Sequence, residues 1–228
     1  MNYKNQEKTV VFSFEGYKKK VLKDYYTIVL SRETSVLGRR EVLSGKGKFG
    51  IFGDGKELPQ IAMNHFFQNG DFRSGYYRDQ TFLMAQGFLT PEDHFAALYA
   101  HPDIKYEPMS AGRQMVGHFS NKLIDENGYW LNQTKQKNHI SDVSSIGAQM
   151  PRLVGLAQAS KIYRKLKIKG SEKFSKNGNE IAWGTIGNAG TSEGLFFEAI
   201  NAIGVLQIPV VMSIWDDGYG ISVKNEQQ

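Results

Sequence analysis

The sequence predicts an α/β protein in which a mostly parallel sheet lies between two layers of helices. The most regular part of the chain, residues 180–216, reads as a strand (EIAWGTIG), an amphipathic helix (TSEGLFFEAINAIGVLQ) and an apolar, β-branched strand (IPVVMSIWD). A βαβ unit of this kind belongs to a parallel sheet with helices on its faces. The 228 residues are 40% hydrophobic and 12% aromatic, which is enough for one sizeable core. Because the chain stops at Gln228, soon after the second strand, we expect the sheet to be incomplete at its C-terminal end.

Composition limits the classes of site without selecting one. Lys plus Arg number 28 against 23 for Asp plus Glu, and the net charge of +5 suits an anionic ligand as well as a nucleic acid. The chain has no cysteine, which excludes disulfides, thiolate zinc sites and a cysteine nucleophile. The first ten residues are polar and no run approaches 18 apolar residues, so we expect neither a signal peptide nor a membrane span, and a cytoplasmic location.

The N-terminal part of the chain predicts one long helix. Between Lys18 and Leu43, apolar residues recur at helical spacing among charged residues, and a glycine-rich stretch follows. We therefore divide the chain into an N-terminal helical segment, residues 1–44, and a ligand-binding domain, residues 45–228.

Shorter elements follow. Residues 58–68 and 91–100 predict helices, the second with Thr90 as its N-cap and Pro91 at its first helical position. Between them, FRSGYYRD (residues 72–79) predicts a short strand or a turn.

The middle of the chain alternates connections with a helix. Residues 124–142 are polar and rich in Asn, Gly and Gln, which predicts a surface connection long enough to have a function. Residues 144–166 then turn helical. The lysine-rich residues 167–180 are typical of a solvated linker.

Two glycine motifs do not predict a site. Residues 45–50 match GxGxxG, but they follow a helix rather than a strand, so a flexible connection is a better interpretation than a dinucleotide site. Residues 53–55 spell GDG, but no strand precedes them, and Leu83, 29 positions beyond Asp54, cannot bind a metal. This triplet predicts a turn.

The informative motif is GNAGTSEG, residues 187–194, between the first strand and the helix of the βαβ unit. Small residues allow a diphosphate to approach the backbone, and the N–H groups at a helix start carry partial positive charge. Thr191 or Ser192 can cap that helix. Ligands of open α/β sheets bind at this kind of loop, beyond the carboxyl ends of the strands.

A second motif, WDDGYGIS, follows the second strand and places Asp217 29 positions after Asn188. In a βαβ unit this spacing brings both side chains to one sheet edge. With a backbone carbonyl from the turn at Tyr219, they offer an oxygen cage for magnesium, which would clamp a diphosphate. The competing interpretation is a glycine turn with a capping Asn188 and solvated aspartates.

At these residues the sequence resembles thiamin-diphosphate enzymes, whose signature is Gly-Asp-Gly followed further along the chain by Asn. It most resembles the alpha-type part of the decarboxylating component of 2-oxo acid dehydrogenases, and this implies a three-layer αβα thiamin-diphosphate-binding fold. Here Asn188 occupies the aspartate's position and Asp217 the asparagine's, so the exchange retains the charge and the ligand oxygens. Ala189 replaces the last glycine, and Gly190 beside it supplies backbone freedom.

The resemblance extends from about Lys18 to Ser222 and implies roles for further residues. Tyr77 and Arg78 match a Tyr-Arg pair that the family aims at the diphosphate, and we expect Arg78 to face it from the side opposite the magnesium ion. Taken alone, an arginine in a turn is more often a surface residue.

His118, in GRQMVGHF, falls where the family places an active-site histidine, although a lone histidine is more often a core residue. This segment resembles the branched-chain members more than the pyruvate members. Ser144 and Ile146 lie in SSIGAQMP, which matches the segment that contacts the aminopyrimidine. The implied cofactor ligands are Tyr77, Arg78, Ser144, Ile146, Gly187, Ala189 and Gly190, and the implied metal ligands are Asn188, Asp217 and Tyr219.

The resemblance implies decarboxylation of a 2-oxo acid, branched-chain or pyruvate, and acyl transfer to the lipoyl domain of a partner acyltransferase. The cofactor supplies the carbanion chemistry. The activating glutamate belongs to a beta-type half, fused or separate, so this chain alone is half a site. The alternatives are a non-catalytic or regulatory subunit that kept the fold, and a nucleotide-binding Rossmann domain. Against the second, this sequence lacks an acidic ribose partner after a glycine fingerprint. We expect neither a nucleic acid nor a membrane as a partner.

Overall fold

A computed structural model describes residues 13–114 and 116–228 of the chain. The polar N-terminal residues considered above, and the start of the predicted 1–44 segment, lie outside the described residues. The longer elements are α1 (Phe14–Leu43), α2 (Glu57–Asn64), β1 (Phe72–Ser74), α3 (Gln80–Ala85), α4 (Pro91–Leu98), β2 (Asn138–His139), α5 (Gln149–Lys165), β3 (Ala182–Gly187), α6 (Gly194–Leu206), β4 (Val210–Trp215), β5 (Tyr219–Gly220) and β6 (Val223–Lys224). Short 3-10 turns lie at Gln133–Lys135, Ser171–Lys173, Ala189–Ser192 and Asn225–Gln227.

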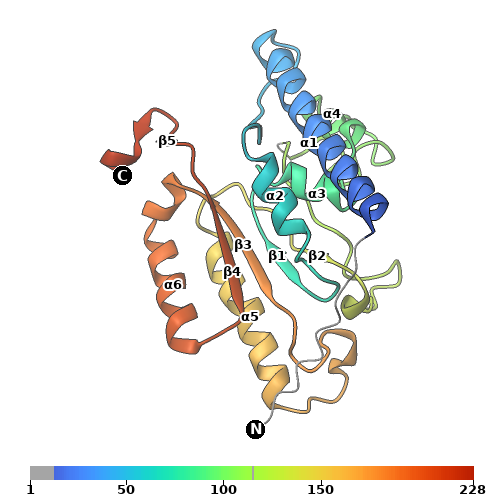
Figure 1. Cartoon of the computed structure of the whole chain (residues 1–228), viewed down its shortest axis with the longest axis vertical. Coiled ribbons are helices and arrows are strands. Elements are labelled where there is room, and N and C mark those ends of the chain that lie inside the picture. The colour runs from blue at the N-terminus through green and yellow to red at the C-terminus, as the bar shows by residue number, and fades with distance from the viewer. Residues whose placement is uncertain (1–12, 115) are drawn as a thin grey trace.

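The main sheet is parallel throughout, in the order β2-β1-β3-β4. β3 and β4 pair along their whole length, from Ala182 opposite Val210 to Gly187 opposite Trp215. Because all four strands run in one direction, their carboxyl ends meet at one edge of the sheet (Figure 1). The loops that leave this edge carry most of the residues that the sequence assigns to the site.

Side chains of β3 point alternately to the two faces of the sheet, and each face has its own hydrophobic core. On one face α5 and α6 pack against the sheet; this cluster contains Met150, Leu153, Ala157, Ala182, Ile186, Ala199 and Ile208. On the other face α2 and α3 cover the sheet; this cluster contains Met63, Phe67, Tyr76, Phe82, Trp183 and Trp215. Helices therefore cover both faces of a parallel sheet, as Figure 1 shows, and the predicted three-layer α/β fold is confirmed.

The long N-terminal helix is confirmed, but the pattern that predicted it points away from the core. α1 begins at Phe14, four positions earlier than expected, where the Ser13 side chain accepts a hydrogen bond from the backbone N–H of Gly16. Its buried face is polar: the Ser31 hydroxyl lies 2.7 Å from that of Thr81. Apolar residues of the predicted pattern, including Tyr25, are exposed. Polar contacts thus dock α1 on α2 and α3.

Three local predictions differ from the structure. The connection 124–142 includes β2, a buried strand too short and too polar to show strand periodicity. α3 was not predicted, because its six residues are shorter than two helical turns. Neither Thr191 nor Ser192 caps α6; the two residues lie in a 3-10 turn, where the Thr191 hydroxyl donates to the carbonyl of Asn188. The predicted capping of α4 by Thr90 is confirmed by a full capping box.

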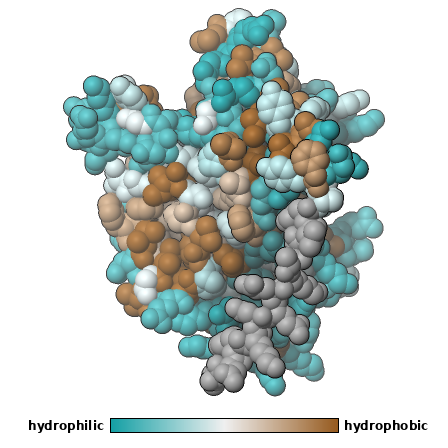
Figure 2. Space-filling view, viewed as in Figure 1, coloured by the Kyte–Doolittle hydropathy of each residue, from teal (hydrophilic) through white to brown (hydrophobic). Residues whose placement is uncertain are grey.

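One outer face of the molecule is apolar. Figure 2 shows hydrophobic side chains gathered over α6 and β4. The exposed residues of this α6/β4 face are Leu195, Phe197, Ile200, Val205 and Ile214. β4 is an edge strand of the sheet and pairs with no further strand among the described residues. Within the same described part of the chain, no helix combines the length and the apolar character that crossing a membrane requires.

A buried ion cluster joins β1 to the loops at the carboxyl edge. The Arg73 side chain is fully buried; its Nε donates to Asp79 Oδ2 at 2.7 Å and its Nη2 to Asp142 Oδ1 at 2.6 Å. Burial alone would lower the pKa of Arg73, but the two carboxylates outweigh it and raise the pKa. The guanidinium therefore stays charged inside the protein.

We expect Asp142→Asn to lower the free energy of unfolding by about 3 kcal/mol or more, because it removes one counter-charge of a buried cation. Asp54→Asn is the matched control; it breaks only the ion pair with the half-exposed Arg39 and is expected to cost less than about 1 kcal/mol. Urea unfolding followed by circular dichroism measures both. Equal losses for the two variants would show that the cluster does not hold this edge of the sheet.

Candidate functional site

The loops at the carboxyl edge of the sheet enclose a cavity of about 230 Å³. It lies between the turn that follows β1 and the loops that follow β3 and β4. Its lining includes most of the residues assigned from the sequence: Tyr77, Arg78, Ile146, Gly187, Asn188, Ala189, Gly190 and Tyr219. Asp217, Ser144 and His118 do not line it.

Two buried polar atoms at this cavity make no well-formed hydrogen bond to a described residue, Tyr76 Oη and Arg78 Nε. The Arg78 guanidinium nevertheless lies close enough to the Tyr76 hydroxyl to act against the rise in its pKa. A Cβ added to Gly187 would lie 3.5 Å from Tyr76 Oη and 3.9 Å from Arg78 Nη1, so the absence of a side chain there keeps both groups accessible from β3. Burial, assisted by the Asp79 carboxylate, raises the pKa of Tyr76, so its hydroxyl keeps its proton. A cavity with unsatisfied donors and a guanidinium fits an anion such as a diphosphate.

The two predicted metal ligands, Asn188 and Asp217, stand at one sheet edge but are engaged with other partners. Asn188 follows β3 and Asp217 lies two positions beyond β4, so both stand at the carboxyl edge of adjacent parallel strands. That their side-chain oxygens lie close enough for one ion to touch both stays a prediction. The Asn188 amide N–H₂ donates to Asn225 Oδ1, and no described residue donates to its amide oxygen. Asp217 Oδ2 lies 2.8 Å from the ammonium of Lys56.

The charges around Asp217 set its protonation. Partial burial would raise the pKa of this carboxyl, but the hydrogen bond and the charge of Lys56 outweigh burial and lower the pKa. Arg78 Nη1 lies 3.7 Å from the same oxygen. Arg78 thus stands next to a predicted metal ligand, because the turn after β1 lies next to the loop after β4. That Arg78 faces the diphosphate from the side opposite the magnesium stays a prediction. The predicted metal ligands Asn188, Asp217 and Tyr219 all offer oxygen atoms, which magnesium prefers. Asp217 is the only carboxylate among them, and it is paired with Lys56.

Close packing accommodates Ala189, which stands where the resembled signature has a glycine. A Cβ on Gly220 would lie 2.4 Å from the Cβ of Ala189, so the glycine of β5 makes room for the alanine methyl. A Cβ on Gly190 would lie 2.6 Å from Cγ2 of Ile146, so Ile146 packs directly on this loop. The loop conformation thus depends on Gly190 and Gly220 together.

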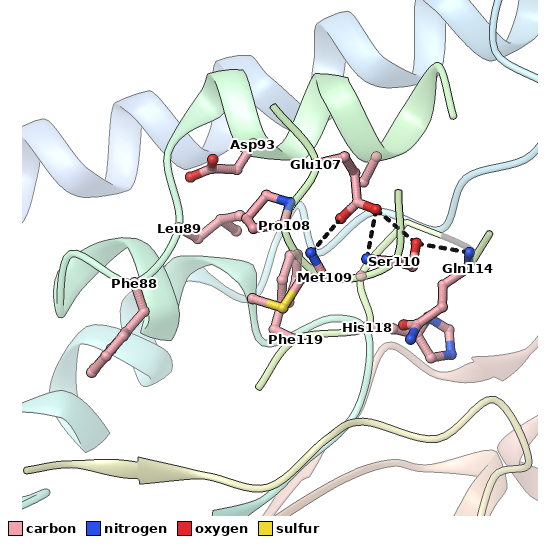
Figure 3. A pocket seen from close by; sticks show the side chains of 12 residues that line it. Phe88, Leu89, Asp93, Glu107, Pro108, Met109, Ser110, Gln114, His118 and Phe119 are labelled. Carbon is pink, nitrogen blue, oxygen red and sulfur yellow. Dashed lines mark hydrogen bonds between the residues drawn. The ribbon is translucent and has the colours of Figure 1, made fainter. Parts of the chain in front are cut away.

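His118 and Ser144 form a separate pair beside this cavity. His118 Nε2 lies 2.7 Å from the Ser144 hydroxyl, and the His118 side chain also lines a small second cavity of about 50 Å³. Figure 3 shows that cavity and the carboxylate of Glu107, which accepts hydrogen bonds from the backbone N–H groups of Met109 and Ser110. Glu107 thereby shapes the loop that leads to His118.

Sequence reasoning missed Tyr76 and Lys56. Tyr76 precedes the Tyr-Arg pair, and only its burial against β3 shows that its hydroxyl reaches the cavity. Lys56 follows the GDG triplet, which is a turn as predicted but lies against the site: a Cβ on Gly53 would lie 2.7 Å from the carbonyl oxygen of Arg78. The sequence carried no signal of that contact, because it joins segments far apart in the chain.

Several known proteins have sequences similar to this chain. The family model described as "Dehydrogenase E1 component" matches residues 29–228. The 2-oxoisovalerate dehydrogenase subunit alpha of Bacillus subtilis is 30% identical over 210 residues, which are 90% of this chain and 53% of that protein. The mitochondrial 2-oxoisovalerate dehydrogenase subunit alpha of Caenorhabditis elegans is 26% identical over 81% of this chain and 36% of its own length.

A pyruvate dehydrogenase relative is similar to the same degree. The E1 component subunit alpha of Acholeplasma laidlawii is 26% identical over 90% of this chain and 48% of its own length. The chain thus spans about half, or less, of the length of these relatives. Because the family model covers most of the chain, the protein belongs to the dehydrogenase E1 component family.

Proposed function

We propose that this chain is the alpha-type part of the decarboxylating component of a 2-oxo acid dehydrogenase and holds thiamin diphosphate through magnesium. The proposed substrate is a branched-chain 2-oxo acid or pyruvate, and the acyl group would pass to lipoamide. The observation that carries the proposal is the cavity at the carboxyl edge of the sheet, where Tyr76 Oη and Arg78 Nε are buried and make no well-formed hydrogen bond to a described residue. The names of the relatives support the reaction class.

Each residue at the cavity has a binding or orienting task in this proposal. Arg78 and Tyr76 donate to the diphosphate, and the small residues from Gly187 to Gly190 let it approach the backbone. Ile146, packed on Gly190, would wedge the organic part of the cofactor. When bound, the cofactor supplies carbanion chemistry. His118, held by Ser144, is the proposed proton carrier.

The proposal includes a magnesium ion. Asn188, Asp217 and the backbone carbonyl of Tyr219 are its proposed ligands, and phosphate oxygens and water would complete the shell. The amide oxygen of Asn188 accepts no hydrogen bond from the described residues, which suits a ligand role.

The proposed partners are a beta-type half and the lipoyl domain of an acyltransferase component. The apolar α6/β4 face supports a protein partner, because exposed patches of this kind mark interaction surfaces. The beta-type half would contribute the glutamate that activates the cofactor. A cytoplasmic location completes the proposal.

The second candidate function is a non-catalytic or regulatory subunit that kept the fold. The Lys56–Asp217 ion pair favours it, since this pair neutralises the proposed metal ligand without a metal. Calorimetric titration of the protein with thiamin diphosphate and magnesium distinguishes the two. Binding that requires both supports the enzyme, and a lack of binding supports the regulatory subunit.

We expect Asp217→Ala to abolish metal-dependent binding of thiamin diphosphate, because it removes the only carboxylate of the proposed metal shell. Asp54→Ala is the control, since Asp54 pairs with Arg39 and does not line the cavity. Calorimetric titrations at fixed magnesium concentration measure both variants. Equal effects of the two substitutions would mean that Asp217 is not the metal ligand.

We expect Arg78→Ala to weaken cofactor binding by roughly ten- to a hundredfold, because a charge-assisted hydrogen bond contributes about 1.5 to 3 kcal/mol. Arg78→Lys should restore only part of the affinity, because lysine keeps the charge but loses the planar fork. Thiamin diphosphate titrations of the assembled enzyme at one salt concentration provide the test. An alanine variant that binds as tightly as the parent would show that Arg78 does not contact the diphosphate.

We expect the 228 residues alone to release no carbon dioxide from 2-oxoisovalerate, because the activating glutamate is assigned to the beta-type half. Adding that half should restore the activity. The measurement is carbon dioxide release with thiamin diphosphate and magnesium present. Turnover by the chain alone would contradict the assignment.

A further inference from the structure

A buried lysine reaches the proposed metal ligand from a distant part of the chain. Lys56 stands at the N-terminus of α2 and is 7% exposed. Its ammonium lies 2.8 Å from Asp217 Oδ2, across 161 positions of sequence. A buried lysine is rare unless its charge is paired, so this contact is a specific feature of the fold.

The loop that carries Lys56 is fixed against the wall of the cavity. Gly53 approaches the Arg78 carbonyl oxygen so closely that a Cβ would lie 2.7 Å from it. Gln60, one helical turn beyond Lys56, donates to the same carbonyl oxygen at 2.9 Å. Glu57 accepts from the N–H of Gly55 and pairs with Arg32 of α1. The ammonium is therefore held in position by the fold.

The charges around Asp217 indicate the role of Lys56. Lys56 and Arg78 both lie near Asp217 Oδ2, at 2.8 Å and 3.7 Å. Two cations thus face the Asp217 carboxylate, while the neighbouring Asp216 carboxylate also interacts with Lys56 and Asp217, so the four charges balance before any metal binds. A divalent ion that approaches Asp217 meets an oxygen already paired and a repulsive ammonium beside it.

We propose that Lys56 is an internal cation of the site, which competes with a divalent ion for the Asp217 carboxylate and so sets the metal affinity of this protein. The inference rests on the proposed role of Asp217 as a metal ligand. Lys56 holds the carboxylate in place when no ion is bound, and the ion must displace the ammonium to bind.

The test uses Mn²⁺ as a paramagnetic probe, with free Mn²⁺ measured by electron paramagnetic resonance in the assembled protein. Lys56→Met removes the ammonium and keeps the buried stem, and Mn²⁺ should bind about tenfold more tightly, since losing the competing pair frees the carboxylate. Lys56→Gln should behave in the same way. Lys56→Arg keeps the charge and should bind Mn²⁺ as the parent does.

Lys46→Met is the matched control, because Lys46 also pairs with a carboxylate, that of Glu41 at 3.4 Å, but is exposed. It should leave Mn²⁺ binding unchanged. If Asp217→Ala abolishes Mn²⁺ binding while the folded Lys56→Met and Lys56→Gln variants bind it only as tightly as the parent, the inference is overturned and the metal site stands. If Asp217→Ala leaves Mn²⁺ binding intact, the proposed metal site itself is wrong.

Discussion

The buried charge of Arg73 is the constraint on which the carboxyl edge of the sheet depends. A guanidinium in the middle of a parallel sheet is tolerated only where carboxylates surround it, because an unpaired buried charge costs several kcal/mol. Asp79, in the turn after β1, and Asp142, beyond β2, meet this need. Gly75 has to be a glycine here, since a Cβ would lie 2.1 Å from Asp79 Oδ2. One cation thus fixes two loops.

Each of the two carboxylates also organises one part of the site. Asp79 accepts hydrogen bonds from Thr185 of β3 and Trp215 of β4, and so ties the turn that presents Tyr76 and Arg78 to the two strands that frame the cavity. Asp142 accepts from the backbone N–H of Phe119, the residue after His118. The groups proposed to bind the diphosphate and His118 therefore share a support, although they line different cavities.

Features that depend on residues close together in the sequence could be predicted, and features that depend on contacts between distant segments could not. The loops after β3 and β4 could be predicted because the hydrophobic periods of one βαβ unit place Asn188 and Asp217 at one edge. Lys56 and Tyr76 could not, because their roles arise from packing between segments distant in sequence. α1 was predicted for a reason that does not hold: its apolar residues are largely exposed, and Ser31 and other small polar residues form the buried face. Periodicity identified a helix without identifying which side is buried.

The exchange of Asn188 and Asp217 changes which cations the carboxylate meets. At position 188 the neighbours are the amide side chains of Asn225 and Gln228, which carry no charge, so an aspartate there would remain uncompensated until an ion bound. At position 217 the carboxylate pairs with Lys56, so the protein supplies its counter-charge before any ligand arrives. The exchange retains the oxygens of the proposed metal ligands but changes their electrostatic surroundings. Lys56, Asn188 and Asp217 therefore have to be considered together. The position of the carboxylate determines whether its counter-charge comes from the protein or from a bound ion.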